Sequence, residues 1–268
     1  MQRSITVDKD KCIHCGKCIK DCIVNCLVFD GEKIPRYVDG GEKICVACQH
    51  CMAICPKGAL SFGGKNPDDS EPINFCKSED LLNLIKGRRS FRFYQEKDIP
   101  QDKLSKLIEM LAYPPKGGNV DDLHFSIVGT AEKMREIKKF TYDKIFDIEN
   151  PSPTINFLRE SYKNGRDFVF RGASSMIAVS VDKSKAIAGC ENADPIIALS
   201  YFELYAQSLG LGTVWADATL TLCQEMPEVR ALLEIPQNFT LNYIILLGVP
   251  AVKYARTVQR DAANVKIV

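Results

Sequence analysis

The first quarter of the chain contains the same cysteine pattern twice. The segments CIHCGKCIKDC (Cys12–Cys22) and CVACQHCMAIC (Cys45–Cys55) both read C-x2-C-x2-C-x3-C, at an offset of 33 residues. The repeat continues beyond the cysteines, because the Leu-x-Phe-x-Gly run that starts at Leu27 recurs from Leu60. Self-similarity at a fixed offset indicates two copies of one structural unit.

Cysteine usage limits the chemistry of this repeat. Nine of the 12 cysteines precede residue 56, and the other three are scattered. The start, MQRSITVDKDKC, lacks the apolar region of a signal peptide, and apolar runs such as YIILLGV are far shorter than the roughly 20 residues that span a bilayer. We therefore expect a cytoplasmic protein without a membrane segment, in which thiols stay reduced. Metal binding then explains so many cysteines best.

Charge and linker composition indicate the domain organisation. Lys and Arg number 35 against 34 Asp and Glu, a balance that argues against a nucleic-acid binder. The stretch GGKNPDDSEP at 63–72 is polar and rich in turn formers. We predict a domain at residues 1–64, a linker at 65–77 and a second domain at 78–268.

The second domain alternates between helical and strand patterns. Ser78 is the expected N-cap of its first helix. Gly210 and Gly212 are expected to end a long apolar helix, and the aromatic segment 140–170 is expected to be irregular. Helices are predicted at 78–90, 101–113, 131–140 and 194–212, and strands at 124–130, 174–182 and 239–250. Mixed elements with buried apolar strands predict an α+β chain.

The cysteine repeat resembles the bacterial two-cluster ferredoxins, in which the fourth cysteine of each run ligates the other cluster. The resemblance implies two 4Fe–4S clusters, with Ile23 standing where proline is usual. The implied ligands are Cys12, Cys15, Cys18 and Cys55 for one cluster, and Cys45, Cys48, Cys51 and Cys22 for the other. Zinc, which takes four ligands in pairs, is the alternative. Cys26 aligns with Ala59 in the repeat, so we expect a packed residue rather than a ligand.

Four short motifs carry a second resemblance. They are RRSFRFY at 88–94, PPKGGN at 114–119, GLGTVWADAT at 210–219 and KYARTVQR at 253–260. Together and in this order they resemble the nitroreductase family of flavoproteins over about residues 78–260. The whole chain is similar to ferredoxin-fused nitroreductases. This implies a small ferredoxin-like domain joined to a nitroreductase-like α/β flavoprotein domain, FMN as cofactor, and a homodimer.

The resemblance also implies which residues contact FMN. Arginine suits the phosphate because its planar fork binds such oxygens in bidentate fashion. Lys116 departs from the hydroxyl residue usual in the family, and Asp217 matches an acidic contact to the isoalloxazine edge. The implied contacts are Arg88, Arg89, Ser90, Arg92, Pro115, Lys116, Gly117, Asn119, Asp217, Arg256 and Arg260. We predict no catalytic side chain, because the flavin carries the redox chemistry.

These expectations describe an oxidoreductase. Electrons from a low-potential donor, such as an external ferredoxin, would pass through the clusters to FMN and on to a small aromatic or quinone-like acceptor, for example a nitro compound. Two alternatives stay open at this point. One is a redox-sensing or electron-storage flavoprotein, and the other is a different flavin reduction, such as dehalogenation or enone reduction.

Overall fold

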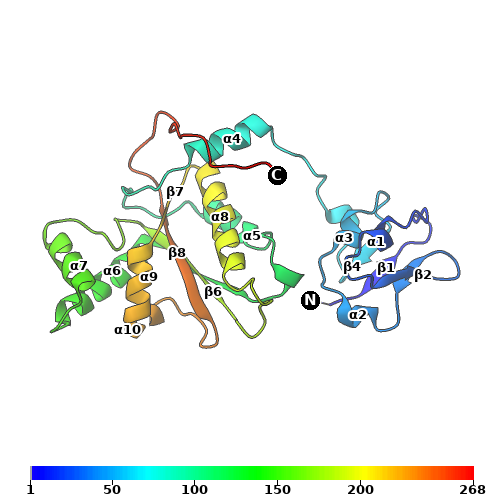
Figure 1. Ribbon diagram of the computed structural model, residues 1–268, viewed down its shortest axis with the longest axis horizontal. Helices are drawn as coiled ribbons and strands as arrows, with labels where there is room; N and C mark the ends of the chain where they lie inside the picture. The colour runs from blue at the N-terminus through cyan, green and yellow to red at the C-terminus, as the bar shows by residue number, and fades with distance from the viewer. Residues whose placement is uncertain (1) are drawn as a thin grey trace. The chain divides into compact units, whose positions relative to one another are not determined.

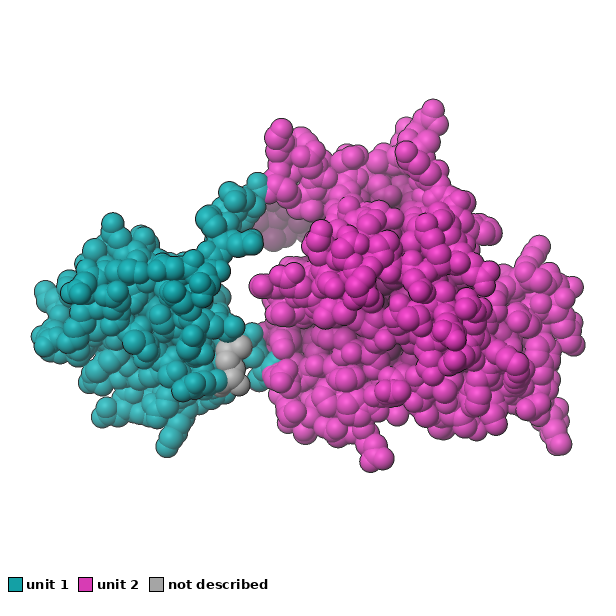
Figure 2. Space-filling model, turned by 180° about the vertical axis from the view of Figure 1, so that it is seen from behind, with its two compact units in different colours: residues 1–75, 118–120 teal, residues 76–117, 121–268 magenta. Residues whose placement is uncertain are grey.

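A computed structural model describes residues 2–268, which divide into two compact units (Figure 2). The first unit comprises the chain up to residue 75 together with 118–120. The second comprises residues 76–117 and 121–268.

The first unit is built from short strands and single-turn helices (Figure 1). Its elements are β1 (Ile5–Val7), α1 (Lys17–Lys20), β2 (Leu27–Phe29), β3 (Pro35–Tyr37), α2 (Gly41–Ile44), α3 (His50–Ala53), β4 (Leu60–Phe62) and the 3-10 turn η1 (Pro67–Asp69). β1 pairs antiparallel with β4, and β2 pairs antiparallel with β3. A small core that includes Cys26, Leu60 and Phe62 joins the two strand pairs.

The backbone of the first unit repeats as its sequence does. Leu27 pairs with Tyr37, and its counterpart Leu60 pairs with Val7. The helix α1 begins after Gly16 and α3 begins after Gln49, and both preceding residues have left-handed backbone conformations, with φ of 69° and 61°. The two halves therefore share one local structure.

The second unit is a four-stranded antiparallel sheet with helices on both faces (Figure 1). Its strand order is β5-β6-β8-β7. The elements are α4 (Ser78–Gly87), α5 (Gln101–Met110), β5 (Leu123–Val128), α6 (Ala131–Asp147), α7 (Pro153–Lys163), β6 (Ser175–Val181), α8 (Ala193–Ser208), β7 (Gly212–Trp215), α9 (Asp217–Glu225), α10 (Pro227–Ala231) and β8 (Thr240–Gly248). The 3-10 turn η2 (Gly117–Asn119) precedes β5.

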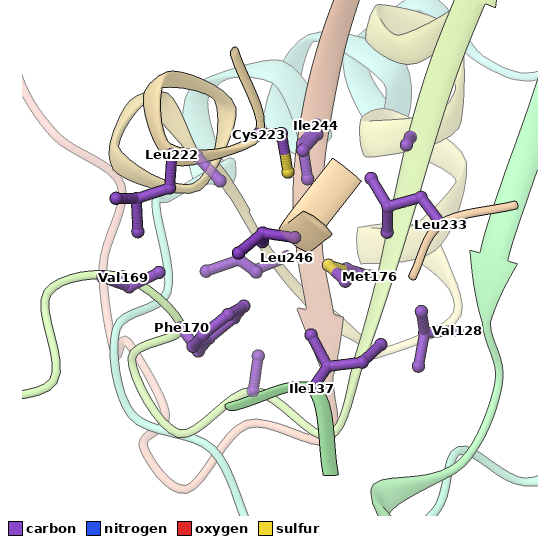
Figure 3. Packing of buried hydrophobic residues seen from close by; sticks show 14 of the residues in the cluster. Val128, Ile137, Val169, Phe170, Met176, Leu222, Cys223, Leu233, Ile244 and Leu246 are labelled. Atoms are coloured by element: carbon purple, nitrogen blue, oxygen red, sulfur yellow. The ribbon is translucent and has the colours of Figure 1, made fainter. Parts of the chain in front are cut away.

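Side-chain alternation along the central strands divides the core of this unit. On β6, Met176 belongs to the hydrophobic cluster that also contains Ile137 and Leu222 from α6 and α9 (Figure 3). The next residue, Ile177, belongs to a second cluster with Phe202 of α8. Successive strand residues point to opposite faces, so β6 is buried on both sides. The continuous apolar strand pattern is thereby explained.

Several details differ from the sequence-based expectations. The helix expected at 194–212 ends at Ser208, and Gly212 is the first residue of β7. The helix expected at 78–90 ends at Gly87. Lys77 is the N-cap of α4, and Ser78 is its first helical residue. The segment 140–170 is not irregular, because α6 continues to Asp147 and α7 follows. Ser152 caps α7 by accepting a hydrogen bond from the Ile155 N–H at 3.3 Å, with Pro153 in the first turn.

The aromatic residues of this segment pack between its helices. Tyr142 of α6 and Tyr162 of α7 stack with ring centroids 3.6 Å apart and an interplanar angle of 16°. The aromatic residues of this segment are therefore core residues of two packed helices, not residues of an irregular loop.

Within residues 2–268, no helix combines the length and the apolar character needed to cross a membrane.

Candidate functional site

In the first unit the cysteines of the repeat gather around two cavities. Cavity A is lined by the thiols of Cys12, Cys15, Cys18 and Cys55. Cavity B is lined by those of Cys22, Cys45, Cys48 and Cys51. Each cavity thus takes three cysteines from one loop and the fourth from the other copy of the repeat. All twelve cysteines are free thiols.

The loops that carry these thiols are bent in the same way in both copies. His14 and Ala47, at equivalent positions, both have left-handed backbone conformations, with φ of 54° and 53°. Such conformations are uncommon outside glycine. The Ala47 N–H donates to Cys45 Sγ at 3.4 Å, and the Ala59 N–H donates to Cys55 Sγ at 3.3 Å. Each cavity therefore brings together four cysteines of the repeat, one of which accepts a backbone N–H, and four cysteines are the number of ligands that a 4Fe–4S cubane takes.

Cys26 is buried in the core of the first unit, as expected, with 2% of its surface exposed. It is also part of cavity B, which the sequence did not indicate. Its Sγ lies 3.3 Å from Cys22 Sγ. Burial, together with the adjacent Cys22, raises the pKa of the Cys26 thiol to about 12.

In the second unit the segment after α4 lies along the outer edge of β7. The Phe91 N–H donates to the Thr213 carbonyl at 2.8 Å, and Ser90 bridges to the same residue. The ring of Phe91 covers Gly212, where an added Cβ would lie only 2.8 Å from the ring. The RRSFRFY motif is therefore held in an extended conformation against the sheet.

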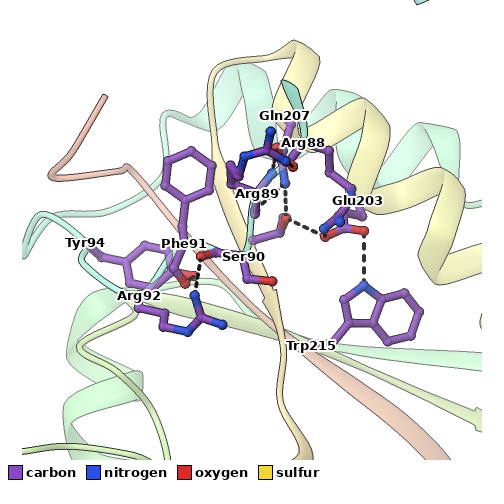
Figure 4. A network of polar contacts seen from close by, with 10 residues as sticks. Arg88, Arg89, Ser90, Phe91, Arg92, Tyr94, Glu203, Gln207 and Trp215 are labelled. Carbon is purple, nitrogen blue, oxygen red and sulfur yellow. Dashed lines mark hydrogen bonds and ion pairs between the residues drawn. The ribbon is translucent and has the colours of Figure 1, made fainter. Parts of the chain in front are cut away.

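A buried carboxylate fixes the first residue of this motif (Figure 4). Arg88 Nη1 lies 3.2 Å from Oε1 of Glu203, a residue of α8 that is 5% exposed. The hydroxyl of Thr213 donates to the same oxygen at 3.3 Å. The Trp215 indole N–H donates to Glu203 Oε2 at 3.1 Å. Three donors thus satisfy Glu203, and the carboxylate orients the Arg88 guanidinium.

Arg89 is fixed in a different way. Its N–H donates to Gln207 Oε1 at 3.1 Å, and Gln207 Nε2 donates to the Arg89 carbonyl at 2.9 Å (Figure 4). Its guanidinium donates to the carbonyls of Arg88 and Lys86. The side chain is therefore used in holding the end of α4.

Arg92 lies beside a cation that the sequence did not single out. Arg92 Nη1 donates to the Ser90 carbonyl at 3.2 Å. Burial and the nearby Arg92 guanidinium lower the pKa of Arg171. Within residues 2–268, neither arginine has a carboxylate within ion-pair distance. The Arg171 guanidinium also lies over the Phe168 ring, 5.3 Å from its centroid. Two mutually repelling guanidiniums favour an anion beside them. The one sequence signal for Arg171 is the turn-forming Arg-Gly pair before β6, which does not by itself predict an anion contact.

Asp217 begins α9 and connects indirectly to the same network. The hydroxyl of Tyr243 donates to Asp217 Oδ1. The ring of Tyr243 meets the ring of Trp215 edge-on, with centroids 5.0 Å apart. Trp215 in turn donates to Glu203, so the fold places Asp217 two side chains away from the carboxylate that holds Arg88.

The remaining predicted contacts are distributed more widely. The Gly117 N–H donates to Asp194 Oδ2 at 2.8 Å, and an added Cβ there would lie 2.5 Å from Cys190 Sγ. Pro115 is exposed and Lys116 is partly buried. Asn119 groups with the first unit, where its Nδ2 donates to the Val46 and Ala47 carbonyls at 3.0 and 3.1 Å. Arg256 and Arg260 lie in the exposed segment 251–268.

Two family profiles match the chain. The nitroreductase family matches residues 85–249, and the 4Fe–4S dicluster domain matches residues 11–59. A Bacteroides fragilis nitroreductase, crystallised with bound FMN, covers 70% of this chain and 98% of its own with 27% identity and a TM-score of 0.58.

Curated relatives match each part of the chain separately. A Methanothermobacter thermautotrophicus protein, provisionally named NADH dehydrogenase/NAD(P)H nitroreductase, is 28% identical over 173 residues, or 64% of this chain and 78% of that protein. Ferredoxin-3 from Nostoc sp. is 36% identical over 71 residues, or 21% of this chain and 73% of that protein. The chain therefore belongs to the nitroreductase family and carries a ferredoxin domain of the 4Fe–4S dicluster type at its first unit.

Proposed function

We propose that this flavin-dependent oxidoreductase takes single electrons from a low-potential donor such as ferredoxin, passes them through two 4Fe–4S clusters to FMN, and reduces a nitro compound or quinone. The observation that carries the proposal is the presence of two four-thiol cavities in one chain with a nitroreductase domain. A cluster exchanges one electron at a time, whereas a hydride donor needs no cluster. The cavities are therefore useful when the donor itself supplies single electrons.

In this proposal the repeat cysteines hold the clusters. The four thiols of cavity A ligate one cluster and the four thiols of cavity B ligate the other. Thiolate sulfurs provide the four ligands that a cubane requires. The backbone N–H groups of Ala47 and Ala59 stabilise the charge on the sulfurs of Cys45 and Cys55.

The second unit would hold FMN, which supplies the exchange between one-electron and two-electron chemistry when bound. The neighbouring guanidiniums of Arg92 and Arg171 offer its phosphate charged hydrogen-bond donors, and Arg88 and Ser90 extend the same edge of the sheet. The B. fragilis structure with FMN supports this cofactor. We retain as contacts, on the family resemblance, Arg89, Pro115, Lys116, Gly117, Asn119, Asp217, Arg256 and Arg260.

A second copy of the chain is part of the proposal. The helix α8 is apolar around most of its circumference, yet Ile196, Tyr201 and Tyr205 on it are exposed. A helix that is apolar all round is normally buried. A homodimer that covers this face of α8 accounts for the exposed residues.

The proposal also keeps the predicted domain bounds of 1–64 and 78–268, joined by residues 65–77. It places the protein in the cytoplasm, where free thiols persist.

The test compares two electron donors in a ligand variant and a matched control. Cys48→Ser removes a predicted ligand of cavity B, whereas Cys76→Ser changes an exposed cysteine outside both cavities. We expect Cys48→Ser to abolish most turnover with reduced ferredoxin but to spare flavin reduction by a donor that reaches the flavin directly. Cys76→Ser should retain both activities. Unchanged ferredoxin-driven turnover in Cys48→Ser would remove the clusters from the electron path.

A further inference from the structure

The two cavities are related by the repeat, yet their walls differ at two equivalent positions. Cys26 lines cavity B, and Ala59 occupies the corresponding position in cavity A. Tyr37 lines cavity B beside Leu27, and Val7 lines cavity A beside Leu60. In both cases cavity B has a hydrogen-bond donor where cavity A has an apolar side chain.

The Cys26 thiol lies within reach of the cavity B ligands. Its Sγ is 3.3 Å from Cys22 Sγ, and Cys45 lines the same cavity. A bonded disulfide would bring the sulfurs to about 2.05 Å, so the two sulfurs are in contact but not bonded. When Cys22 is a thiolate ligand, the Cys26 S–H is the donor and Cys22 the acceptor.

The Tyr37 hydroxyl converges on the same place. Its oxygen is fully buried and has no hydrogen-bond partner among the described residues. Tyr37 and Cys45 line the same cavity. A buried hydroxyl without a partner is costly in a folded protein. A charged sulfur at Cys45 removes that cost, because a thiolate or cluster sulfide accepts the hydroxyl proton in a hydrogen bond.

Cavity A has positive charges instead, but these lie in solvent. Lys17 and Lys57 line it, and both are exposed. Exposed charges are weakened by water and salt, whereas hydrogen bonds inside a protein act at low dielectric. The backbone donors do not distinguish the cavities, because Ala59 serves cavity A and Ala47 serves cavity B. Each cavity is also lined by one exposed histidine, His14 in cavity A and His50 in cavity B. The buried side-chain donors are therefore the main difference.

We propose that Tyr37 and Cys26 donate hydrogen bonds to the sulfur atoms of the cavity B cluster and make it the more easily reduced of the two. Reduction adds negative charge to a cluster, and hydrogen bonds to its sulfurs stabilise that charge. The inference rests on the thiol assignment proposed above and not on the identity of the donor or acceptor. The proposal therefore predicts which cluster is reduced first: an electron that enters the first unit resides at the cavity B cluster.

The experiment is a redox titration followed by electron paramagnetic resonance on the full chain, reconstituted anaerobically. It needs no turnover, so its outcome is independent of the electron path. We expect two one-electron waves in the wild type. Tyr37→Phe and Cys26→Ala should each lower the potential of the higher-potential wave and leave the potential of the other wave unchanged. The expected shift is up to about tenfold in the reduction equilibrium constant, or about 59 mV.

The repeat supplies the matched controls. Ala59→Cys introduces the thiol into cavity A and should raise the lower wave, while Cys26→Ser keeps a donor and should keep the higher wave near its wild-type potential. Iron content verifies that both clusters are present. If Tyr37→Phe assembles poorly, the contrast between Cys26→Ala and Cys26→Ser decides. In variants that contain both clusters, unchanged potentials of both waves, or equal shifts of both, would overturn the proposal.

Discussion

The two units build their candidate sites in opposite ways. In the first unit, all eight repeat cysteines lie between Cys12 and Cys55, and each loop brings three of them to one cavity. In the second unit, the carboxylate that holds Arg88 lies 115 residues further along the chain. Local spacing thus determines the first site, whereas the second exists only after a sheet and a helix have packed together.

This difference predicts different responses to mutation. A thiolate ligand is one of four bonds to a cluster, so its loss should affect the whole cluster. A residue of the second site contributes one hydrogen bond or ion pair among several, so its loss should have a graded effect.

The largest effect is expected from Cys22→Ser, because Cys22 is the only predicted ligand of cavity B that comes from the first copy of the repeat. Loss of this ligand should reduce the iron of anaerobically purified protein from about eight per chain to about four. Cys26→Ala is the control, since Cys26 lies beside Cys22 but is not a predicted ligand. Iron analysis measures both. Equal iron loss in the two variants would show that Cys26 is itself required for the cluster.

A smaller, graded effect is expected from Arg88→Ala. Removal of a charged hydrogen-bond partner should weaken FMN binding by about 1.5–3 kcal/mol, measured by fluorescence titration of the apoprotein. Arg89→Ala is a neighbouring comparison, because the Arg89 guanidinium already donates to the carbonyls of Arg88 and Lys86. We expect it to weaken FMN binding less. An unchanged dissociation constant in Arg88→Ala would exclude this residue from the site.

The same contrast explains what the sequence could predict. The cysteine spacing predicted two sets of ligands because a short loop can present its thiols to only one nearby cluster. Long apolar runs predicted β6, β8 and α8, because a buried strand or helix is recognisable without knowledge of its partners. Glu203 was missed, because a lone glutamate in an apolar helix carries no periodic signal. Its role depends on Arg88 and Trp215, which reach it through the fold.

The segment 140–170 shows a second limit of sequence reasoning. Its aromatic and proline content favoured an irregular loop, yet Ser152 and Pro153 are a helix start. The stacking of Tyr142 on Tyr162 depends on α6 and α7 packing against each other. Residue types alone do not indicate that contact.

Glu203→Gln tests whether the buried carboxylate orients Arg88. Breaking a fully buried ion pair costs about 3–5 kcal/mol. Here the Arg88 side chain is 35% exposed, so water screens part of its charge. We expect the apoprotein to lose about 1–2 kcal/mol of its free energy of unfolding in a denaturant titration.

The glutamine variant should also change FMN binding in a way that a purely structural role would not. Without the carboxylate, the charge of Arg88 is no longer neutralised, so FMN should protect the variant more strongly than it protects the wild type. Glu225→Gln, on the exposed side of α9, is the control for charge alone. A stable variant with normal FMN binding would mean that Glu203 does not position Arg88.

The smallest effect is expected on thermal stability at acid pH and involves Asp167. The carboxylate of Asp167 holds the loop that carries Arg171. Burial alone would raise the pKa of Asp167, but the Phe170 N–H at 2.8 Å and Lys138 Nζ at 2.9 Å lower it overall. A carboxylate with a lowered folded-state pKa adds stability above its unfolded pKa of about 3.9, and this stability is lost as the pH falls through the folded value. The wild type should therefore lose thermal stability below about pH 4, and Asp167→Asn should reduce that loss by on the order of 2–4 °C in Tm. Asp143→Asn, in an exposed pair with Lys139, should leave the pH profile unchanged. Identical acid limbs in the wild type and Asp167→Asn would show that this carboxylate does not stabilise the loop. The cation beside Arg92 would then be held by its own backbone turn alone.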